Sequence, residues 1–170
     1  VMVFASVASL AASITINSVD EINTKTGDVK VSFTTDMAET DQLTGFLNKL
    51  STTLKVNELI REEDEEGALF IFDIDDFKKL NDTYGHRVGD IFLKEFTNKL
   101  SLSFRSTDVL GRVGGEEFVL YLSGVGDNRH YLEEKAMQIQ SICNSVLLEA
   151  CPDKEFSCSI GVARFPFDGK

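Results

Sequence analysis

Residues 68–90 read ALFIFDIDDFKKLNDTYGHRVGD and place a run of apolar side chains directly before a group of carboxylates. The uninterrupted apolar run from Ala68 to Phe72 is typical of a strand buried on both faces in the middle of a sheet. The run ends in Asp73, and two more aspartates follow at positions 75 and 76. Carboxylates at the end of a buried strand cost free energy unless they are paired or bound to a cation. The stretch therefore predicts a central strand that ends at a site for a hard divalent ion such as Mg²⁺.

A calcium-binding EF-hand loop is the rival interpretation of these aspartates. Such a loop needs a glycine at its sixth position and a closing glutamate at its twelfth. Counted from Asp73, these positions hold Lys78 and Tyr84, so the EF-hand is excluded. Lys78 instead lies close enough along the chain to contact the phosphates of a metal-bound nucleotide.

A second acidic group lies in the stretch GRVGGEEFVL, residues 111–120. Gly114 and Gly115 precede a β-prone run, and two glycines allow the positive φ angles of a two-residue hairpin turn. We therefore expect a β-hairpin over residues 109–122, with Glu116 and Glu117 just past its tip. Neighbouring strand residues point to opposite faces, so the two glutamates need not share one role. Taken alone, these ten residues fit a solvent-exposed hairpin end equally well.

Four blocks of the sequence share one explanation. They are DQLTGFLNK (41–49), DIDDFKKLNDTYGHRVGD (73–90), RSTDVLGRVGGEEF (105–118) and CSIGVARFP (158–166). In order and spacing the blocks resemble the GGDEF domains, the diguanylate cyclases that condense two GTP molecules into cyclic di-GMP. The variant here is GGEEF, a common and functional form. The resemblance implies an α/β (α+β) fold with a palm-like antiparallel sheet flanked by helices, similar to nucleotide cyclases and polymerase palms.

The resemblance also implies a role for each acidic residue. Asp73, the backbone carbonyl of Ile74, and Glu116 or Glu117 would hold two Mg²⁺ ions per active site, with Mn²⁺ as an alternative. Glu116 and Glu117 are the catalytic candidates. Glu116 is the one expected nearest the attacking ribose 3′-hydroxyl, as general base or as metal ligand. The division of labour between the two glutamates stays open.

The candidate substrate-binding residues all lie in the second block: Phe77, Lys78, Asn81, His86 and Asp90. Asp90 and Asn81 together match the N1–H and N2–H donors and the O6 acceptor of guanine, whereas adenine presents the opposite pattern. Their structural alternatives are a helix-terminal asparagine and a helix N-terminal charge. Lys78 and Phe77 are expected to line the phosphates and the base pocket. Lys78 also fits an ordinary exposed lysine, and His86 fits a loop-capping residue.

Arg105 and Asp108 form an RxxD pair placed upstream of the glycines, as in the inhibitory site of the family. An arginine fork can bind guanine O6 and N7 or a phosphate, and an aspartate can accept from N1 and N2. The resemblance therefore implies allosteric binding of the product cyclic di-GMP. Without that position in the motif, RxxD is more often a surface ion pair.

One domain offers one GTP site, whereas a cyclic dinucleotide needs two, so catalysis is expected in a homodimer whose assembly an upstream sensory module controls. The main rival is a catalytically silent GGDEF domain that acts as a receptor for cyclic di-GMP or GTP. A second rival is a cyclase with relaxed base choice that also accepts adenine.

Composition narrows the class of partner. The net charge of −11 argues against binding to a nucleic acid polymer, because such proteins carry basic surfaces. Three cysteines leave one unpaired in any disulfide scheme and fit no zinc spacing, so Cys143 and Cys158 are expected in the core of a cytoplasmic protein. The full-length protein could still be membrane-anchored through an upstream segment.

The chain divides into residues 1–37, expected to be the tail of an upstream sensor or linker, and residues 38–170, the GGDEF domain. The uncharged residues 1–19 resemble a poor membrane-helix stub, and SITI (13–16) and VKVSF (29–33) predict a hairpin. The chain stops before the further C-terminal helix that the family carries, so either weak GTP binding or an inactive fragment is expected.

Apolar spacing predicts four helices in the domain. The first carries the stripe Leu43, Phe46, Leu47, Leu50 and Leu54, and the others run over about 77–83, 88–104 and 129–149. The alternation of apolar residues after Phe156 predicts a half-buried final strand.

Overall fold

The computed structural model describes residues 21–22, 29–30, 39–61 and 66–168. Contacts divide the chain into two units, Val1–Ala38 and Glu39–Lys170. In the first unit, β1 (Glu21–Ile22) and β2 (Val29–Lys30) form an antiparallel pair with Glu21 opposite Lys30. The second strand of the expected hairpin is thus found at its predicted place. Its expected first strand at 13–16 and the apolar stub at 1–19 lie outside the described residues, and the sensor module stays a prediction.

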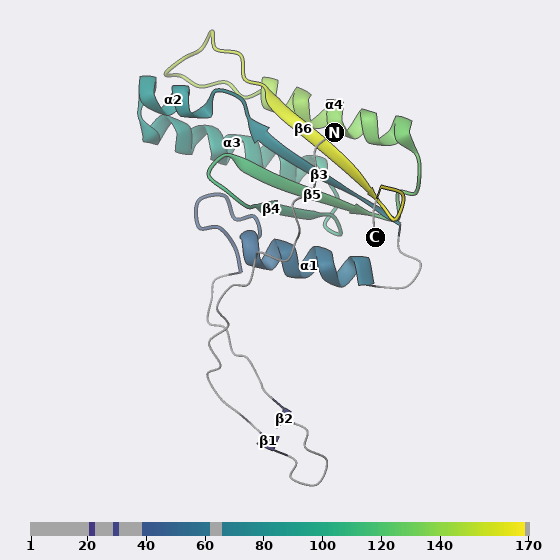
Figure 1. Ribbon diagram of the computed structural model, residues 1–170. Coiled ribbons are helices and arrows are strands. Elements are labelled where there is room, and N and C mark those ends of the chain that lie inside the picture. The colour runs from purple at the N-terminus through teal and green to yellow at the C-terminus, as the bar shows by residue number, and fades with distance from the viewer. Residues whose placement is uncertain (1–20, 23–28, 31–38, 62–65, 169–170) are drawn as a thin grey trace. The chain divides into compact units, whose positions relative to one another are not determined.

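The second unit is a four-stranded antiparallel sheet in the order β4–β5–β3–β6, with helices on both faces (Figure 1). Its strands are β3 (Gly67–Ile74), β4 (Val109–Arg112), β5 (Glu117–Ser123) and β6 (Cys158–Phe165). Its helices are α1 (Lys49–Arg61), α2 (Phe77–Tyr84), α3 (His86–Ser103) and α4 (Arg129–Asn144). The expected α+β fold with an antiparallel sheet is confirmed.

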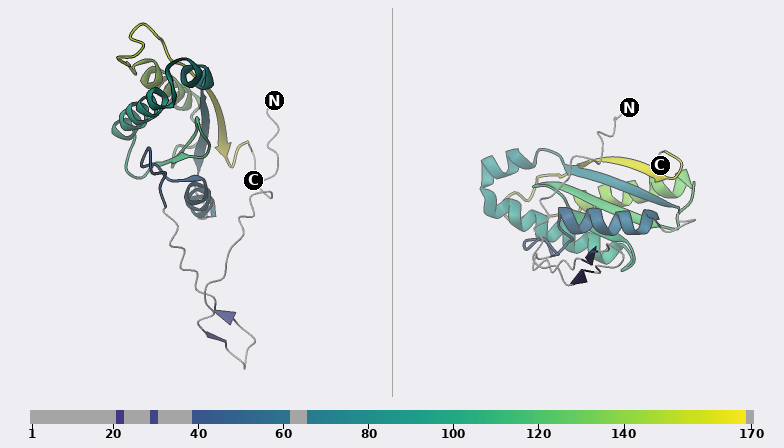
Figure 2. Two further views of the ribbon diagram at one scale, coloured as in Figure 1. Left: turned by 90° about the vertical axis from the view of Figure 1, so that its left-hand side faces the viewer. Right: turned by 60° about the horizontal axis from the view of Figure 1, so that its bottom comes forward.

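The core lies between the sheet and the helices α2, α3 and α4, which the two views of Figure 2 place together on one face. Phenylalanine rings fill it. Phe72 of the central strand stacks on Phe118 of β5, with ring centroids 5.7 Å apart, and meets Phe96 of α3 edge-on at 6.1 Å. Phe92 of α3 packs on Phe156, which lies just before β6, at 4.4 Å. These contacts fix α3 against both β3 and the start of β6.

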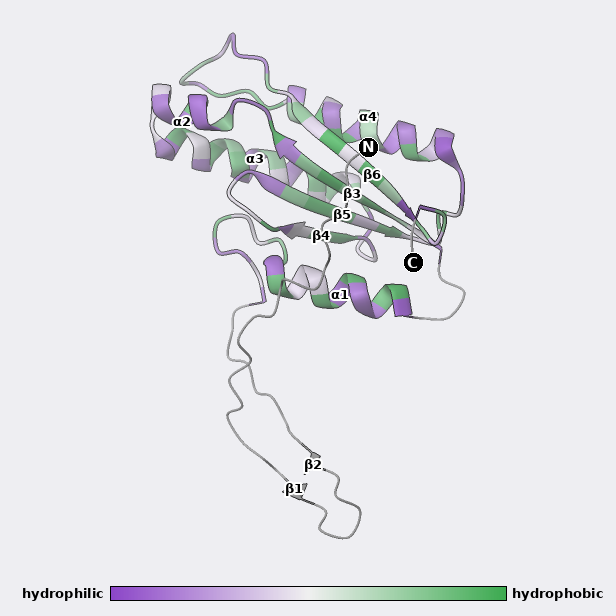
Figure 3. Cartoon of the chain, in the orientation of Figure 1, coloured by the Kyte–Doolittle hydropathy of each residue, from purple (hydrophilic) through white to green (hydrophobic). Residues whose placement is uncertain are grey.

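The central strand is buried on one face and partly open on the other. Ala68, Phe70, Phe72 and Ile74 are at most 1 % exposed, whereas Ile71 on the opposite face is 42 % exposed. The expectation of a strand buried on both faces was therefore wrong for Ile71. The reason is that α1 packs over the β4–β5 half of that face, where it buries Tyr121, and leaves the β3–β6 half open. In Figure 3 the strands consist mainly of apolar residues, whereas polar and apolar residues alternate along the helices.

The first helix of the domain begins at Lys49, so the first three residues of its predicted apolar stripe, Leu43, Phe46 and Leu47, lie before it. Asp41 starts a turn instead, because its carboxylate accepts hydrogen bonds from the backbone N–H and the hydroxyl of Thr44, at 2.9 and 2.7 Å. Asn48 then caps α1 through the N–H of Ser51. Short polar side chains thus outweigh the helical periodicity before Lys49.

The helix α4 ends at Asn144, five residues before its predicted end. Beyond it, Val146 and Leu148 are buried while Leu147 is 76 % exposed, so the apolar residues alternate as in an extended chain. Cys143 and Cys158 lie in the core as free thiols, as predicted. Within the described ranges no helix has the length and apolar character needed to cross a membrane.

Candidate active site

The sheet register brings the two acidic stretches together at one end of β3. Asp73 lies directly opposite Glu117 in the β3–β5 pair. One residue later, the backbone N–H of Ile74 donates to the carbonyl of Glu116 at 3.3 Å. The end of the central strand and the GGEEF loop are therefore neighbours through backbone pairing, although more than forty residues separate them along the chain.

The turn that carries the glutamates is wider than a two-residue hairpin. The backbone N–H groups of Val113 and Gly114 both donate to the carbonyl of Glu117, at 2.9 and 3.3 Å. Among the described glycines, Gly114 and Gly115 do not have positive φ, so the expected turn type was wrong. Gly114 is needed for space instead, because a Cβ there would collide with the carboxylate of Glu117.

The carboxylates at this end of the sheet repel one another. The pKa of Asp73 is raised above its ordinary value by burial, then by the charge of Glu116 and that of Glu117, with Asp75 adding a smaller share. Among the described residues, no lysine, arginine or histidine forms an ion pair with Asp73, Glu116 or Glu117. The site has an excess of negative charge, which a cation would neutralise.

The donor set fits a magnesium ion that is completed by its substrate. In the described part of the chain, no three acidic, histidine or cysteine side chains are already arranged to enclose a metal ion. Mg²⁺ does not need such a cage, because it usually takes one or two carboxylates together with waters and substrate phosphates. Asp73, the carbonyl of Ile74 and one of the two glutamates would supply that partial set.

Asp75 has hydrogen-bond partners of its own at this end of the sheet. Its carboxylate accepts hydrogen bonds from the hydroxyls of Ser157 and Ser159, at 2.5 and 2.7 Å. Its backbone N–H donates to the carbonyl of Ser157 at 3.0 Å. Asp75 therefore joins the end of β3 to the start of β6, and its charge reaches Asp73 only through space.

Asn81 carries a buried acceptor without a donor. Its Oδ1 atom has no hydrogen-bond partner among the described residues, and it lies against the Cα of Gly89, where a Cβ would collide with it. An unpaired buried acceptor costs about 1–3 kcal/mol, which donors of a ligand would relieve once the amide turns outward. Asp90 is one residue beyond Gly89 and is exposed. The two guanine candidates thus lie on facing helices, α2 and α3.

The other candidates differ in accessibility. Lys78 and His86 are exposed, the first on α2 and the second at the start of α3. Phe77 is only 7 % exposed and its ring packs on Phe92 in the core. Its side chain belongs to the core, so only its backbone and the edge of its ring could face a substrate.

The RxxD residues form a turn between α3 and β4. The backbone N–H of Arg105 donates to the carboxylate of Asp108 at 2.8 Å, and the N–H of Asp108 donates back to the carbonyl of Arg105 at 3.0 Å. The guanidinium of Arg105 is exposed and, within the described residues, forms no ion pair. The strand β4 separates this turn from the GGEEF loop, and its four residues span roughly 13 Å at about 3.3 Å each.

Comparison with known proteins decides the family. The model of "Diguanylate cyclase, GGDEF domain" matches residues 38–170, more than half of the chain. The chain belongs to the GGDEF family. Diguanylate cyclase DgcS of Shewanella oneidensis is 47 % identical over 128 residues, which cover 73 % of this chain and 41 % of DgcS. The chain thus spans less than half the length of that relative.

Solved GGDEF structures have the same fold. A sensory box/GGDEF family protein from Caulobacter crescentus matches with a TM-score of 0.70 at 30 % identity, over 78 % of this chain and 86 % of its own. The GGDEF domain of DgcB from the same organism, solved in complex with c-di-GMP, matches with a TM-score of 0.64 at 25 % identity, over 77 % and 80 %.

One contact of this GGDEF domain was not foreseen in the sequence. Arg112, directly before the loop, donates from Nε and Nη2 to the carbonyl of Gly115 at 3.2 and 2.7 Å. Its Nη1 forms an ion pair with Asp41 at 2.9 Å. Burial alone would raise the pKa of Asp41, but the hydrogen bonds from Thr44 and Arg112 outweigh it and hold the pKa below its ordinary value. Asp41 and Arg112 are 71 positions apart, so spacing gave no signal.

We expect Asp73→Asn to stabilise the metal-free GGDEF domain at neutral pH. Because the folded-state pKa of Asp73 is raised, its ionisation destabilises the fold above the ordinary value of 3.8 and has no effect below it. The melting temperature of the variant should therefore exceed that of the wild type at pH 7, and the gap should close as the pH falls below about 4. Added Mg²⁺ should raise the wild-type value more than that of the variant.

Asp75→Asn is the matched control for that measurement. Its carboxylate accepts two serine hydroxyls, so the substitution should lower the melting temperature rather than raise it. Equal melting temperatures for wild type and Asp73→Asn across the pH range would mean that the carboxylates do not repel one another.

Proposed function

We propose that this GGDEF domain is a diguanylate cyclase, which condenses two GTP into cyclic di-GMP and releases pyrophosphate. The observation that carries the proposal is the position of Asp73 opposite Glu117, with Ile74 bonded to Glu116, in a chain of this family. Three carboxylates without a protein cation suit a triphosphate that arrives with divalent metal ions. A receptor that only binds nucleotide would not need them.

In this proposal, each residue acts on one part of the substrate. Asp73, the carbonyl of Ile74 and one glutamate hold two Mg²⁺, with Mn²⁺ as the alternative. When bound, the ions neutralise the triphosphate, acidify the attacking hydroxyl and stabilise the leaving pyrophosphate. Glu116 accepts the proton of the ribose 3′-hydroxyl as the oxygen attacks the α-phosphorus. Lys78 contacts the phosphates, since its amine is exposed near the start of α2.

Guanine selection is assigned to Asn81 and Asp90. The unpaired Oδ1 of Asn81 supports this, because a base with N–H donors would satisfy an acceptor that the protein leaves alone. Adenine presents an acceptor at N1 and would leave the carboxylate of Asp90 facing another acceptor. His86 is exposed at the start of α3, four residues before Asp90, and serves as a further substrate contact in this proposal.

The product requires two chains. Each domain binds one GTP, and two new 3′–5′ phosphodiester bonds form while two bonds between α- and β-phosphates break. Two domains in a homodimer therefore present their GTP molecules to each other, and two pyrophosphates leave. We assign control of this assembly to an upstream sensory module.

The test is to incubate the purified full-length protein with GTP and Mg²⁺ and to separate the products by chromatography. Cyclic di-GMP and pyrophosphate should form in a ratio of one to two, and ATP in place of GTP should give no cyclic product. GTP that stays intact, together with tight uptake of added cyclic di-GMP, would replace the cyclase by a catalytically silent receptor. Mixed adenine-containing products would remove Asn81 and Asp90 from base selection.

We further assign product inhibition to Arg105 and Asp108. The exposed guanidinium of Arg105 has no competing carboxylate among the described residues, and Asp108 already holds the turn in place. In the same chromatographic assay, Arg105→Ala should keep the initial rate and lose inhibition by added cyclic di-GMP. An unchanged inhibition curve would remove the pair from product binding.

A further inference from the structure

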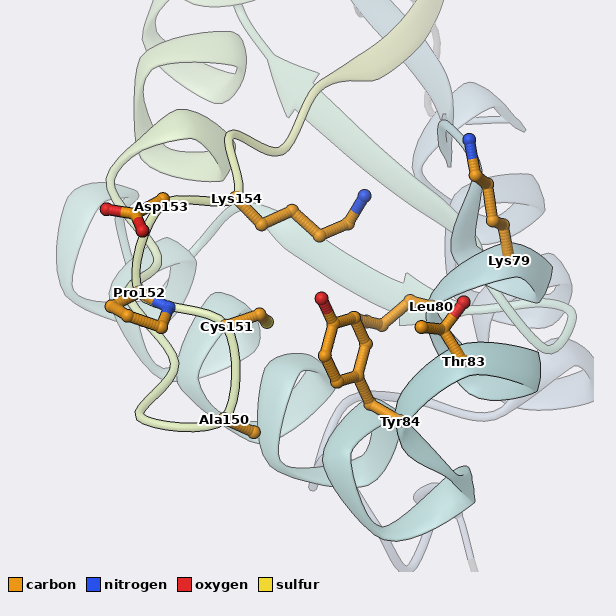
Figure 4. Close-up of a pocket in the computed structure, with 9 residues that line it drawn as sticks. All are labelled: Lys79, Leu80, Thr83, Tyr84, Ala150, Cys151, Pro152, Asp153 and Lys154. Carbon is orange, nitrogen blue, oxygen red and sulfur yellow. The ribbon is translucent and has the colours of Figure 1, made fainter.

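A pocket of about 460 Å³ lies between α2 and the segment that joins α4 to β6. It is separate from the residues discussed so far, and Figure 4 shows its walls. The residues that matter for its chemistry are Lys79, Leu80 and Tyr84 from α2 and Cys151, Asp153 and Lys154 from the joining segment. The volume lies within the range of about 300–1,000 Å³ typical of small-molecule sites.

The pocket and the guanine candidate Asn81 use different parts of the surface of α2. Successive helical residues are rotated by about 100°, so Lys79 and Thr83 lie on one side of the buried Leu80. Asn81 and Lys78 lie on the other side of Leu80. Asn81 faces Gly89 of α3. Tyr84 also lines the pocket and lies about 40° from Leu80 on the side of Asn81, so the pocket extends toward Asn81, although Asn81 itself is not among its lining residues.

Two lysines give the pocket its charge. The side chains of Lys79 and Lys154 come from opposite walls, and the amine of Lys154 extends across the hollow in Figure 4. Among the described residues, neither lysine forms an ion pair. The carboxylate of Asp153 points away from the hollow (Figure 4). The amine of Lys154 lies over the ring of Phe156, 5.5 Å from its centroid, which leaves its charge without a carboxylate partner among the described residues. In a chain with a net charge of −11, two such lysines across one pocket favour an anionic ligand.

The remaining walls suit a flat, apolar body. Leu80 and Cys151 are 1 % and 6 % exposed, and they close the floor. Tyr84 is 42 % exposed, and its ring flanks the hollow with its hydroxyl directed inward (Figure 4). The hydroxyls of Tyr84 and Thr83 can donate to an oxyanion, and the tyrosine ring can stack on another ring.

We propose that this pocket is a binding site for a small organic phosphate that carries a planar ring. The dianionic phosphate lies between Lys79 and Lys154, where two ammonium groups match its charge. The ring lies between Tyr84 and the apolar floor formed by Leu80 and Cys151. A phosphate suits the pair of lysines better than a carboxylate, because it offers three acceptor oxygens and a second charge.

The probe for the test is phenyl phosphate, titrated into the isotope-labelled protein while backbone amide NMR signals are followed. The backbone amides of residues 83, 84, 151, 153 and 154 should shift together and saturate, whereas Pro152 has no amide signal. Inorganic phosphate should bind about tenfold more weakly or worse, since it lacks the ring, and phenol should not saturate the site. This result does not depend on whether the protein makes cyclic di-GMP.

The double variant Lys79→Gln with Lys154→Gln should raise the dissociation constant for phenyl phosphate about tenfold or more, with an unchanged melting temperature. Lys94→Gln, an exposed lysine of α3 outside this pocket, is the matched control and should bind as the wild type does. Unchanged affinity in the double variant would overturn the proposal. So would shifts confined to residues 73–78 and 81, or equal affinity for inorganic phosphate.

Discussion

Glu117→Gln is expected to lower the rate of cyclic di-GMP formation by about 10³-fold or more, because a metal-binding carboxylate supplies several kcal/mol of transition-state stabilisation. The fold should persist. Glu117 is exposed at the start of β5, and its backbone carbonyl, which accepts from Val113 and Gly114, is unchanged by the substitution. Glutamine also keeps the shape that packs against Gly114.

The measurement is the initial rate of pyrophosphate release at saturating GTP and Mg²⁺, together with the melting temperature. Glu95→Gln, an exposed carboxylate on α3, is the control and should retain the wild-type rate. A Glu117→Gln protein that turns over at the control rate would remove Glu117 from the metal site. Comparison with Glu116→Gln then separates the roles, since loss of a general base should also remove the acidic limb of the pH–rate profile.

Arg112→Ala is expected to destabilise the domain by about 2–3 kcal/mol, since it removes charged hydrogen bonds to two partners. The Arg112 side chain is 13 % exposed and that of Asp41 is 27 %, so water replaces these bonds only in part. For a domain of this size the melting temperature should fall by about 5–10 °C. The cyclase rate should fall as well, by about tenfold or more, because Gly115 beside the glutamates loses its anchor.

The pH dependence of this effect follows from Asp41. Its folded-state pKa is lowered, so the stability that the pair contributes is fully present above the ordinary value of 3.8 and is lost as the pH falls through the folded-state pKa. The gap between wild type and Arg112→Ala should therefore narrow in acid. Arg61→Ala at the exposed end of α1 is the control.

The variant Arg112→Lys separates the effect of the positive charge at position 112 from that of the guanidinium hydrogen bonds. Lysine keeps the positive charge toward Asp41, but its single nitrogen cannot replace the Nε and Nη2 donors that both bond to the carbonyl oxygen of Gly115. We expect partial recovery of stability and little recovery of rate. A variant that matches the wild type in both would show that the guanidinium fork is not needed.

The sequence predicted those parts of the molecule that depend on apolar periodicity and on short motifs. The end of β3 at the aspartates and the strand that follows the glycines were correctly expected, because a buried strand and a β-prone run have clear patterns. The late start of α1 was missed because the carboxylate of Asp41 bonds to Thr44 and overrides the helical spacing that follows.

Other features depend on contacts that no local pattern contains. The open face at Ile71 follows from where α1 packs, and the pairing of Asp41 with Arg112 joins distant segments. Gly114 and Gly115 were read as positive-φ residues, whereas at Gly114 the limiting factor is the space taken by Glu117. The roles proposed for Asn81, Asp90, Arg105 and Asp108 rest on the family motifs and stay predictions.

The direct pairing of Asp73 with Glu117 has a consequence for how this domain can vary in length. The two residues are held opposite each other by strand register, so the chain between them contributes nothing to their distance. Extra residues in the surface turns around α2 and α3 would leave the acidic pair in place. A single residue inserted into β3 or β5 would turn one carboxylate to the opposite side of the sheet. Natural insertions should therefore collect between residues 75 and 108 and spare the two strands.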